Sequence, residues 1–189
     1  MKRIWNYKFS VMIAIVCIWA SAAFGAVIEG VEFNKKLATK EATLNLRGTG
    51  LLKYMVFIKA YVGALYLPQN VPSAEVLSDV PKHLVLEYFH PIEGHKFGPA
   101  TIAALEKNLD TETLDELMPR IDYHNSLYVD VQPGDRYSLT YLPGQGTTLR
   151  LNGVERGTIE GADFAAAIFS IWLGAKPMDT KFKRSLLGM

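Results

Sequence analysis

The chain has 189 residues, of which 49% are hydrophobic, and its 20 Lys and Arg residues nearly balance its 19 Asp and Glu residues. This length suits one domain with a sizeable core. The charge balance lacks the excess of cations that nucleic-acid binding needs, so we expect no nucleic-acid partner. Because Cys17 is the single cysteine, the chain can form neither an internal disulfide nor a thiolate metal site.

The first 25 residues have the pattern of a secretory signal peptide. Three basic residues precede an almost entirely apolar stretch over residues 9–22, and residues 23–25 carry the small residues that permit cleavage before Ala26. An uncleaved membrane anchor is the alternative, but the apolar stretch is shorter than the ~20 residues of a spanning helix. We therefore predict a signal peptide over residues 1–25 and one domain over residues 26–189. This domain would be periplasmic or secreted, with membrane contact only through the signal peptide before cleavage.

The first part of the predicted domain has the composition of β-structure. Residues 27–33 are a short strand candidate, and Gly48-Thr49-Gly50 predicts a turn because glycine adopts positive φ at no steric cost. Residues 54–67 are rich in Tyr, Val, Phe and Ile, which predicts one long bent strand that ends at Pro68. Residues 84–89 predict a further strand.

A helical pattern follows in the middle of the chain. From Gly98, apolar residues recur at intervals of three and four, which indicates a helix. A second, short helix is expected over residues 113–117, because Pro119 follows it. Residues 120–132 have no clear periodicity and stay unassigned.

The last third of the chain predicts strands and then two helices. Residues 137–141 alternate between large apolar and small polar side chains, as in a half-buried strand. Asn152-Gly153 predicts a tight hairpin between the strands on either side of it. Apolar residues lie on one side of a helix over residues 161–174, and Asp179 begins a last helix. The whole pattern predicts an α+β fold, in which an antiparallel sheet and a layer of helices enclose a cleft for a small apolar ligand.

Several motifs stand in a fixed order along the chain. They are Gly48-Thr49-Gly50, the run FIKAYVGALYL over residues 57–67, PGD over 133–135, YLPGQG over 141–146, FSIWLGAKP over 169–177 and LLG over 186–188. Their order and spacing resemble the bacterial chalcone isomerase-like family over nearly all of the predicted domain. The resemblance implies an open-faced β-sandwich, a large antiparallel sheet with a layer of helices. In plant members the cleft closes a hydroxychalcone into a flavanone, and fatty-acid-binding relatives hold a carboxylate and an apolar tail there.

The position of the family's catalytic arginine falls on Leu52. A guanidinium there would offset the negative charge that develops on a carbonyl oxygen, and leucine cannot do this. Arg47 and Lys53 are the nearest cations. In a strand, side chains an odd number of residues apart point to opposite faces, and both Arg47 and Lys53 are at odd spacing from Leu52. Lys and Arg side chains are also more often exposed to solvent than buried. The sequence leaves open whether either cation faces the cleft.

Other family positions carry hydroxyl, amide and apolar groups. Tyr61 stands where the plant enzymes have a threonine, and its hydroxyl either binds a ligand oxygen or bonds the backbone in the core. Thr101 and Asn108 match the positions of a tyrosine and an asparagine that lie two turns apart on one helix of the plant enzymes. The alternative for Asn108 is a polar residue near a helix end. Ile171 takes the place of a further threonine, and Trp172 follows it. The candidate catalytic residues are therefore Tyr61, Thr101 and Asn108, and the candidate ligand-binding residues are Leu52, Lys53, Tyr61, Ile171 and Trp172.

We expect no metal and no cofactor. His90, Glu93 and His95 lack the spacing of a helical metal-binding pair, and the sequence shows no further ligand cluster near them.

Our leading interpretation is an exported chalcone isomerase-like protein that binds a small hydrophobic or fatty-acid-like ligand. The first alternative is an active intramolecular lyase or isomerase, with Arg47, Lys53 or Tyr61 as the electrophilic helper. The second is a non-catalytic structural partner in the cell envelope. The sequence does not decide whether the protein is an enzyme, which ligand it takes, or its oligomeric state.

Overall fold

A computed structural model describes residues 24–39, 41–55 and 57–189. The predicted signal peptide, residues 1–25, therefore lies almost wholly outside the described residues, and its cleavage remains a prediction. Within the described part of the chain, every helix is too short or too polar to cross a bilayer.

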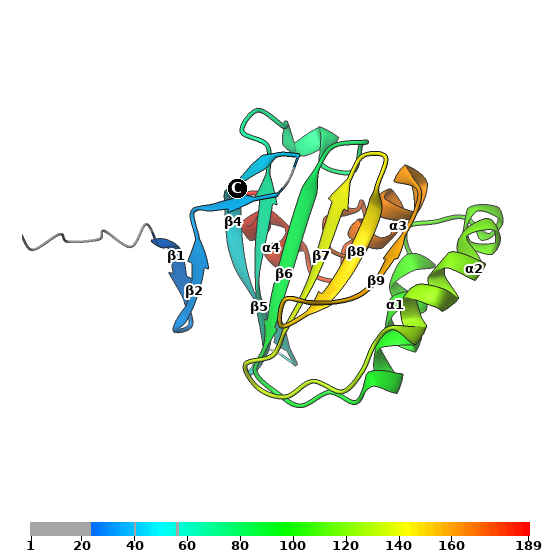
Figure 1. Cartoon of the computed structure of the whole chain (residues 1–189). Coiled ribbons are helices and arrows are strands. Elements are labelled where there is room, and N and C mark those ends of the chain that lie inside the picture. Colours follow the sequence, from blue (N-terminus) through cyan, green and yellow to red (C-terminus); the bar gives the residue numbers. More distant parts are fainter. Residues whose placement is uncertain (1–23, 40, 56) are drawn as a thin grey trace, which may run out of the picture.

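The main sheet has seven antiparallel strands in chain order (Figure 1). Its strands are β3 (Lys36–Ala38), β4 (Thr43–Tyr54), β5 (Ile58–Leu67), β6 (Lys82–Tyr88), β7 (Arg136–Leu142), β8 (Gly146–Leu151) and β9 (Val154–Ile159). A separate hairpin precedes it, formed by β1 (Phe24–Ile28) and β2 (Val31–Asn34). Because each strand of the main sheet pairs with its neighbours along the chain, no parallel crossover is needed.

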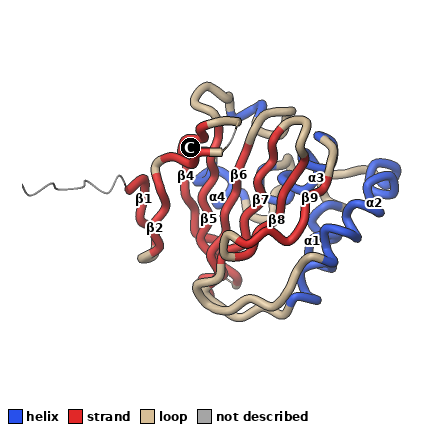
Figure 2. The backbone as a smooth tube through the Cα atoms, viewed as in Figure 1, coloured by secondary structure: helices blue, strands red, loops and turns tan. Residues whose placement is uncertain are grey.

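The helices lie beside and behind this sheet in the view of Figure 2. They are the short 3₁₀ turns η1 (Ser73–Glu75) and η2 (Gly94–Lys96), followed by the helices α1 (Phe97–Leu105), α2 (Thr111–Ser126), α3 (Ala162–Leu173) and α4 (Thr180–Leu186). The predicted α+β fold, a large antiparallel sheet with a layer of helices, is confirmed.

The two faces of the sheet belong to two hydrophobic cores. Along β5, Tyr61 and Leu65 point toward the helices, whereas Val62, Ala64 and Tyr66 belong to a smaller core that the β1–β2 hairpin helps to cover. This is the two-residue alternation expected of a strand that is buried on both sides. The helix-facing core is the one that contains the candidate site.

Gly48 and Gly50 lie inside β4, so the predicted turn at Gly48-Thr49-Gly50 is wrong. Helix α4 packs closely on this strand. A Cβ atom at Gly48 would clash with the backbone oxygen of Ser185, and one at Gly50 would lie 2.8 Å from the ring of Phe182. Glycine is therefore needed here for the close approach of a helix.

We expect Gly48→Ala to lower the free energy of unfolding by about 2 kcal/mol, because the added methyl group forces α4 away from β4. Urea denaturation followed by circular dichroism measures this change. Gly98→Ala is the matched control: it lies in α1, where a Cβ atom would meet its nearest neighbour at 3.5 Å. Alanine should stabilise that helix slightly. Equal stability of the Gly48→Ala variant and the wild type would contradict the close packing of α4.

The predicted strand over residues 54–67 is confirmed as β5 from Ile58 to its end before Pro68, but its first residues belong to the turn of a hairpin. Strand β4 ends at Tyr54 and β5 begins at Ile58. Met55 turns the chain with a positive φ of 48°. The turn was missed because it lacks the Gly, Pro, Asn or Asp residues that usually mark one.

Two other predicted elements differ in extent. The strand candidate over residues 27–33 is two strands joined at Glu29-Gly30, both of which have positive φ. The short helix expected over residues 113–117 is α2, which continues through Pro119 to Ser126. Proline removes one backbone hydrogen bond, but the buried apolar side of α2 keeps the helix intact.

The C-terminal predictions are confirmed. Asn152 and Gly153 have φ values of 50° and 81° and form the tight turn between β8 and β9. The two final helices are α3 and α4, and the side chain of Asp179 caps α4 by accepting a hydrogen bond from the Phe182 backbone N–H at 2.6 Å.

Candidate functional site

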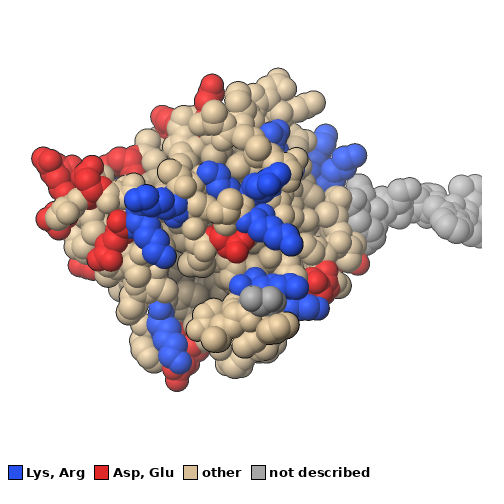
Figure 3. Space-filling view, turned by 180° about the vertical axis from the view of Figure 1, so that it is seen from behind, with Lys and Arg blue, Asp and Glu red and all other residues tan. Residues whose placement is uncertain are grey.

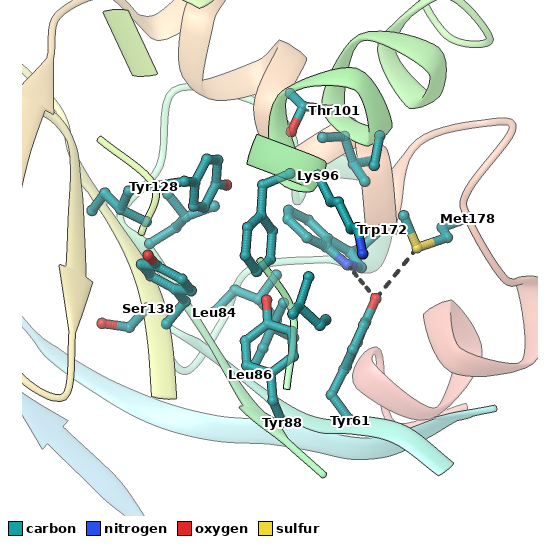
Figure 4. A pocket seen from close by; sticks show the side chains of 17 residues that line it. Tyr61, Leu84, Leu86, Tyr88, Lys96, Thr101, Tyr128, Ser138, Trp172 and Met178 are labelled. Atoms are coloured by element: carbon teal, nitrogen blue, oxygen red, sulfur yellow. Dashed lines mark hydrogen bonds between the residues drawn. The ribbon is translucent and has the colours of Figure 1, made fainter. Parts of the chain in front are cut away.

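A cavity of about 280 Å³ lies between the helix-facing side of the sheet and helices α1 and α3 (Figure 4). Most of the side chains around it are aliphatic or aromatic, as in sites for small apolar ligands. The lining residues are Tyr61, Leu84, Leu86, Tyr88, Ile92, Lys96, Phe97, Ala100, Thr101, Tyr128, Tyr137, Ser138, Leu139, Leu149, Ile171, Trp172 and Met178.

The cavity has a buried end and an exposed end. Leu84 and Leu149 are each 1% exposed. At the other end Met178 is 43% exposed and the Lys96 side chain is 60% exposed. The volume is near the lower limit of the roughly 300–1,000 Å³ usual for small-molecule sites. The shape therefore suits a slim ligand whose apolar part lies inside and whose polar part lies at the mouth.

The hydroxyl group of Tyr61 is held at the mouth by two residues of the C-terminal third. The Trp172 Nε1–H donates a hydrogen bond to the Tyr61 oxygen at 3.0 Å, and the Tyr61 hydroxyl lies 3.4 Å from the Met178 sulfur (Figure 4). A thioether is a weak acceptor. A ligand carbonyl or carboxylate oxygen would therefore be a better partner for the hydroxyl proton of Tyr61 than Met178 is.

Lys96 alone is charged among the cavity-lining residues of the described chain. It ends η2, immediately before α1, and its Nζ lies 2.6 Å from Oε2 of Glu93. Figure 4 shows its amine directed toward the side of the cavity where Trp172 meets Tyr61. The mouth therefore combines a cation with a hydroxyl donor. Sequence reasoning missed Lys96, because a short non-periodic turn gives no signal of which way its side chains point.

The cavity tyrosines are neutral hydroxyl groups at physiological pH. Burial raises the pKa of Tyr61 and of Tyr128, and it raises the pKa of Tyr88 well above the ordinary value. Because the charged form is disfavoured, these groups act as hydrogen-bond donors and acceptors and not as tyrosinate bases.

Four of the sequence-predicted site residues come together in this cavity. Tyr61 from β5, Thr101 from α1, and Ile171 and Trp172 from α3 all line it. Thr101 is 7% exposed, so its hydroxyl lies in the buried part of the wall.

Leu52 and Lys53 are not among the lining residues. Leu52 lies opposite Tyr61 in the sheet and is buried in the helix-facing core. The strand register shifts between Leu52 and Lys53, and Lys53 is exposed to solvent. Arg47 is also exposed, and its guanidinium donates hydrogen bonds to the Leu187 carbonyl and the Ser73 hydroxyl, both at 3.1 Å. It therefore fastens the end of α4 to the sheet.

Asn108 also lies outside the cavity lining, and it does not share a helix with Thr101, because α1 ends at Leu105. Its Oδ1 accepts a hydrogen bond from the Lys176 backbone N–H and its Nδ2 donates one to the Lys176 carbonyl, both at 2.9 Å. Asn108 therefore joins the end of α1 to the loop between α3 and α4, which is a structural role.

The described residues do not include a group of three His, Cys, Asp or Glu side chains close enough to hold a metal ion. Near the cavity mouth, the Glu93 carboxylate is 3.9 Å from the His95 ring and 2.6 Å from Lys96.

The sequence matches the protein family described as chalcone isomerase-like over residues 25–188. The chain belongs to the chalcone isomerase-like family. A crystal structure of a fatty-acid binding protein from Arabidopsis thaliana is similar, with a TM-score of 0.65 and 17% sequence identity over 86% of this chain and 95% of that chain. At this identity the similarity shows the chalcone isomerase-like fold alone. A search of curated proteins gave no match.

Proposed function

We propose that this protein is an exported, ligand-binding member of the chalcone isomerase-like family that holds a small hydrophobic or fatty-acid-like ligand in the cavity. One observation carries the proposal: an apolar cavity is buried at its Leu84–Leu149 end and open beside the cation Lys96. The Arabidopsis protein of the same fold is named as a fatty-acid binding protein, which supports this ligand class. Export rests on the signal-peptide pattern of residues 1–25.

The mode of binding follows from the two ends of the cavity. An apolar tail occupies the buried end, where each methylene group removed from water contributes about 0.8 kcal/mol. The carboxylate stays at the mouth, where Lys96 offers a charge and Tyr61 a hydroxyl proton. Glu93 competes for Lys96 in the empty protein, since the two side chains are 2.6 Å apart. Most of the affinity should therefore come from the tail and only a small part from the ion pair.

Two measurements test this function. Native mass spectrometry of the purified protein should find a co-purified ligand of fatty-acid size. Calorimetric titration with saturated fatty acids of increasing length should show affinity rising by up to about fourfold per methylene group until the cavity is full. A protein that is always empty and that binds every chain length equally weakly would overturn the proposal.

We expect Lys96→Gln to weaken binding of a medium-chain fatty acid by about fivefold, because a half-exposed ion pair contributes about 1 kcal/mol. Binding of the fatty alcohol of equal length should stay within about twofold of the wild type. Lys107→Gln is the matched control, since Lys107 is exposed and does not line the cavity. Equal losses for the acid and the alcohol, measured by calorimetry, would contradict the placement of the carboxylate at Lys96.

An intramolecular lyase or isomerase remains the second candidate, because Lys96 and Tyr61 place a cation and a hydroxyl at the same mouth. Such a pair could stabilise negative charge on a carbonyl oxygen. Against it, Leu52 stands at the position of the family's catalytic arginine, and the described residues that line the cavity include no arginine. Loss of enone absorbance from a 2′-hydroxychalcone, abolished by Tyr61→Phe, would favour the enzyme. A structural role in the envelope would require the cavity to bind neither kind of compound.

A further inference from the structure

The turn between β4 and β5 exposes a group of large apolar side chains, which we call the hairpin tip. It consists of Tyr54, Met55, Phe57 and Ile58, which are 62%, 70%, 88% and 44% exposed. Single exposed apolar residues are common, but several on one turn mark a surface that meets another apolar phase.

The hairpin tip continues the two strands β4 and β5 beyond the cavity. Phe57 and Ile58 share a surface hollow with Glu29 of the β1–β2 turn and with Phe89, which packs against the smaller core on the other face of the sheet. Along β5, Tyr61 lies three residues after Ile58, about 10 Å at the usual rise of a strand. A surface that covers the hairpin tip would therefore lie about 10 Å along β5 from the cavity residue Tyr61.

Helix α4 and the segments on either side of it are rich in basic residues. Residues 174–189 contain four Lys and Arg residues and one acidic residue, Asp179. Figure 3 shows Lys and Arg side chains gathered over the middle of the face seen from behind with a few Asp and Glu side chains among them, whereas a larger group of Asp and Glu side chains lies at the edge on the left. Three exposed residues of this segment are Lys176, Lys181 and Arg184, and Lys53 is an exposed residue of β4 directly before the hairpin tip. None of the four forms an ion pair with another described residue. We call these four residues the basic face.

The direction of α4 brings the basic face toward the hairpin tip. Phe182 packs over Gly50, whereas Ser185 lies over Gly48. Because β4 runs from Gly48 through Gly50 toward Tyr54, the first turn of α4 lies nearer the hairpin than its last turn does. Lys181 therefore stands at the end of α4 that points to the hairpin tip.

We propose that the hairpin tip and the basic face dock this domain onto an anionic lipid surface. Aromatic and aliphatic side chains enter the interface between headgroups and acyl chains, and each Lys or Arg near an anionic surface adds about 1 kcal/mol of attraction. A second copy of the chain fits this surface less well than a lipid surface does, because two basic faces of the same charge would then lie close together and repel. Docking goes beyond the proposed ligand binding, does not require it, and extends membrane contact to the domain itself.

A dye at the hairpin tip tests docking directly. In a Cys17→Ser background, Phe57→Cys is labelled with an environment-sensitive nitrobenzoxadiazole dye and mixed with vesicles of phosphatidylcholine containing phosphatidylglycerol. The emission should shift to shorter wavelength with these vesicles, and the shift should disappear with pure phosphatidylcholine and at high salt. The control is Gln145→Cys in the β7–β8 turn, at the opposite end of the antiparallel sheet. Both variants share residues 1–25, so membrane contact by that segment cannot imitate a difference between them.

Charge reversal tests the basic face. Lys53→Glu combined with Lys181→Glu should weaken binding of the tip-labelled protein to the anionic vesicles by about tenfold or more. Lys36→Glu, on the exposed edge strand β3, should stay within about twofold. The proposal is overturned by an unchanged emission at position 57, by equal binding to neutral vesicles, or by equal binding after charge reversal. Self-association that Phe57→Ser abolishes without lipid, seen by analytical ultracentrifugation, would also overturn it and assign the hairpin tip to a second copy.

Discussion

Ala100→Trp is expected to weaken binding of a medium-chain fatty acid at least about 100-fold while the domain stays folded. Ala100 lines the cavity from α1, four residues after Lys96. An indole at this position would occupy the space where the first methylene groups of the ligand must lie, so that burial of several methylene groups, at about 0.8 kcal/mol each, is lost. The position is exposed to solvent on its outer side, so the larger side chain does not overpack the core.

The matched control for this variant lies on the same helix. Ala103 is exposed and does not line the cavity. Ala103→Trp should therefore bind the fatty acid as the wild type does. Calorimetric titration of both variants, with circular dichroism as the check on folding, gives the comparison. Unchanged affinity in the Ala100→Trp variant would show that the ligand binds elsewhere.

Acid is expected to destabilise the protein through His124 by about 3 kcal/mol. This residue of α2 is fully buried between Tyr128 and Phe164, and neither of its ring nitrogens has a hydrogen-bond partner among the described residues. Burial lowers the pKa of His124 from 6.5 to about 4. The unfolded chain therefore binds a proton at higher pH than the folded one, and stability falls as the pH drops from about 6.5 to about 4.

His124→Leu should remove this acid dependence and should also raise the stability at neutral pH by about 1–2 kcal/mol, because two unpaired buried nitrogens are replaced by an apolar side chain. Urea denaturation of the wild type and the His124→Leu variant across this pH range gives the difference between their free energies of unfolding. Titration of the remaining groups contributes equally to both proteins and cancels in this difference. His95→Gln, at an exposed position, is the control and should follow the wild type. Parallel pH profiles of the wild type and the His124→Leu variant would contradict the neutral buried histidine.

Local sequence signals predicted much of the fold. The alternation over residues 137–141 and the Asn152-Gly153 turn are decided by neighbouring residues, and both are as expected. The glycines of β4 were misread, because their conformation depends on α4, which packs on them from more than 130 residues further along the chain. The β4–β5 turn was missed for a related reason: Met55 adopts a conformation that its own residue type does not favour.

The candidate site was predictable only where the family motifs supplied positions. Tyr61, Ile171 and Trp172 were found in this way, and all three line the cavity. Lys96 and Met178 were not found, because each lies in an irregular segment that reaches the mouth only through tertiary packing. The effect of Lys96 on the interpretation is large, since it supplies charge at the mouth, whereas Leu52, at the position of the family's arginine, lies outside the cavity lining.

The most direct measurement is a crystal structure with a medium-chain fatty acid that carries a bromine atom at its methyl end. We predict anomalous density for the bromine at the buried end of the cavity, near Leu84 and Leu149, with the carboxylate beside Lys96. Bromine density outside the cavity, or a ligand reversed so that its carboxylate lies against those leucines, would contradict the account.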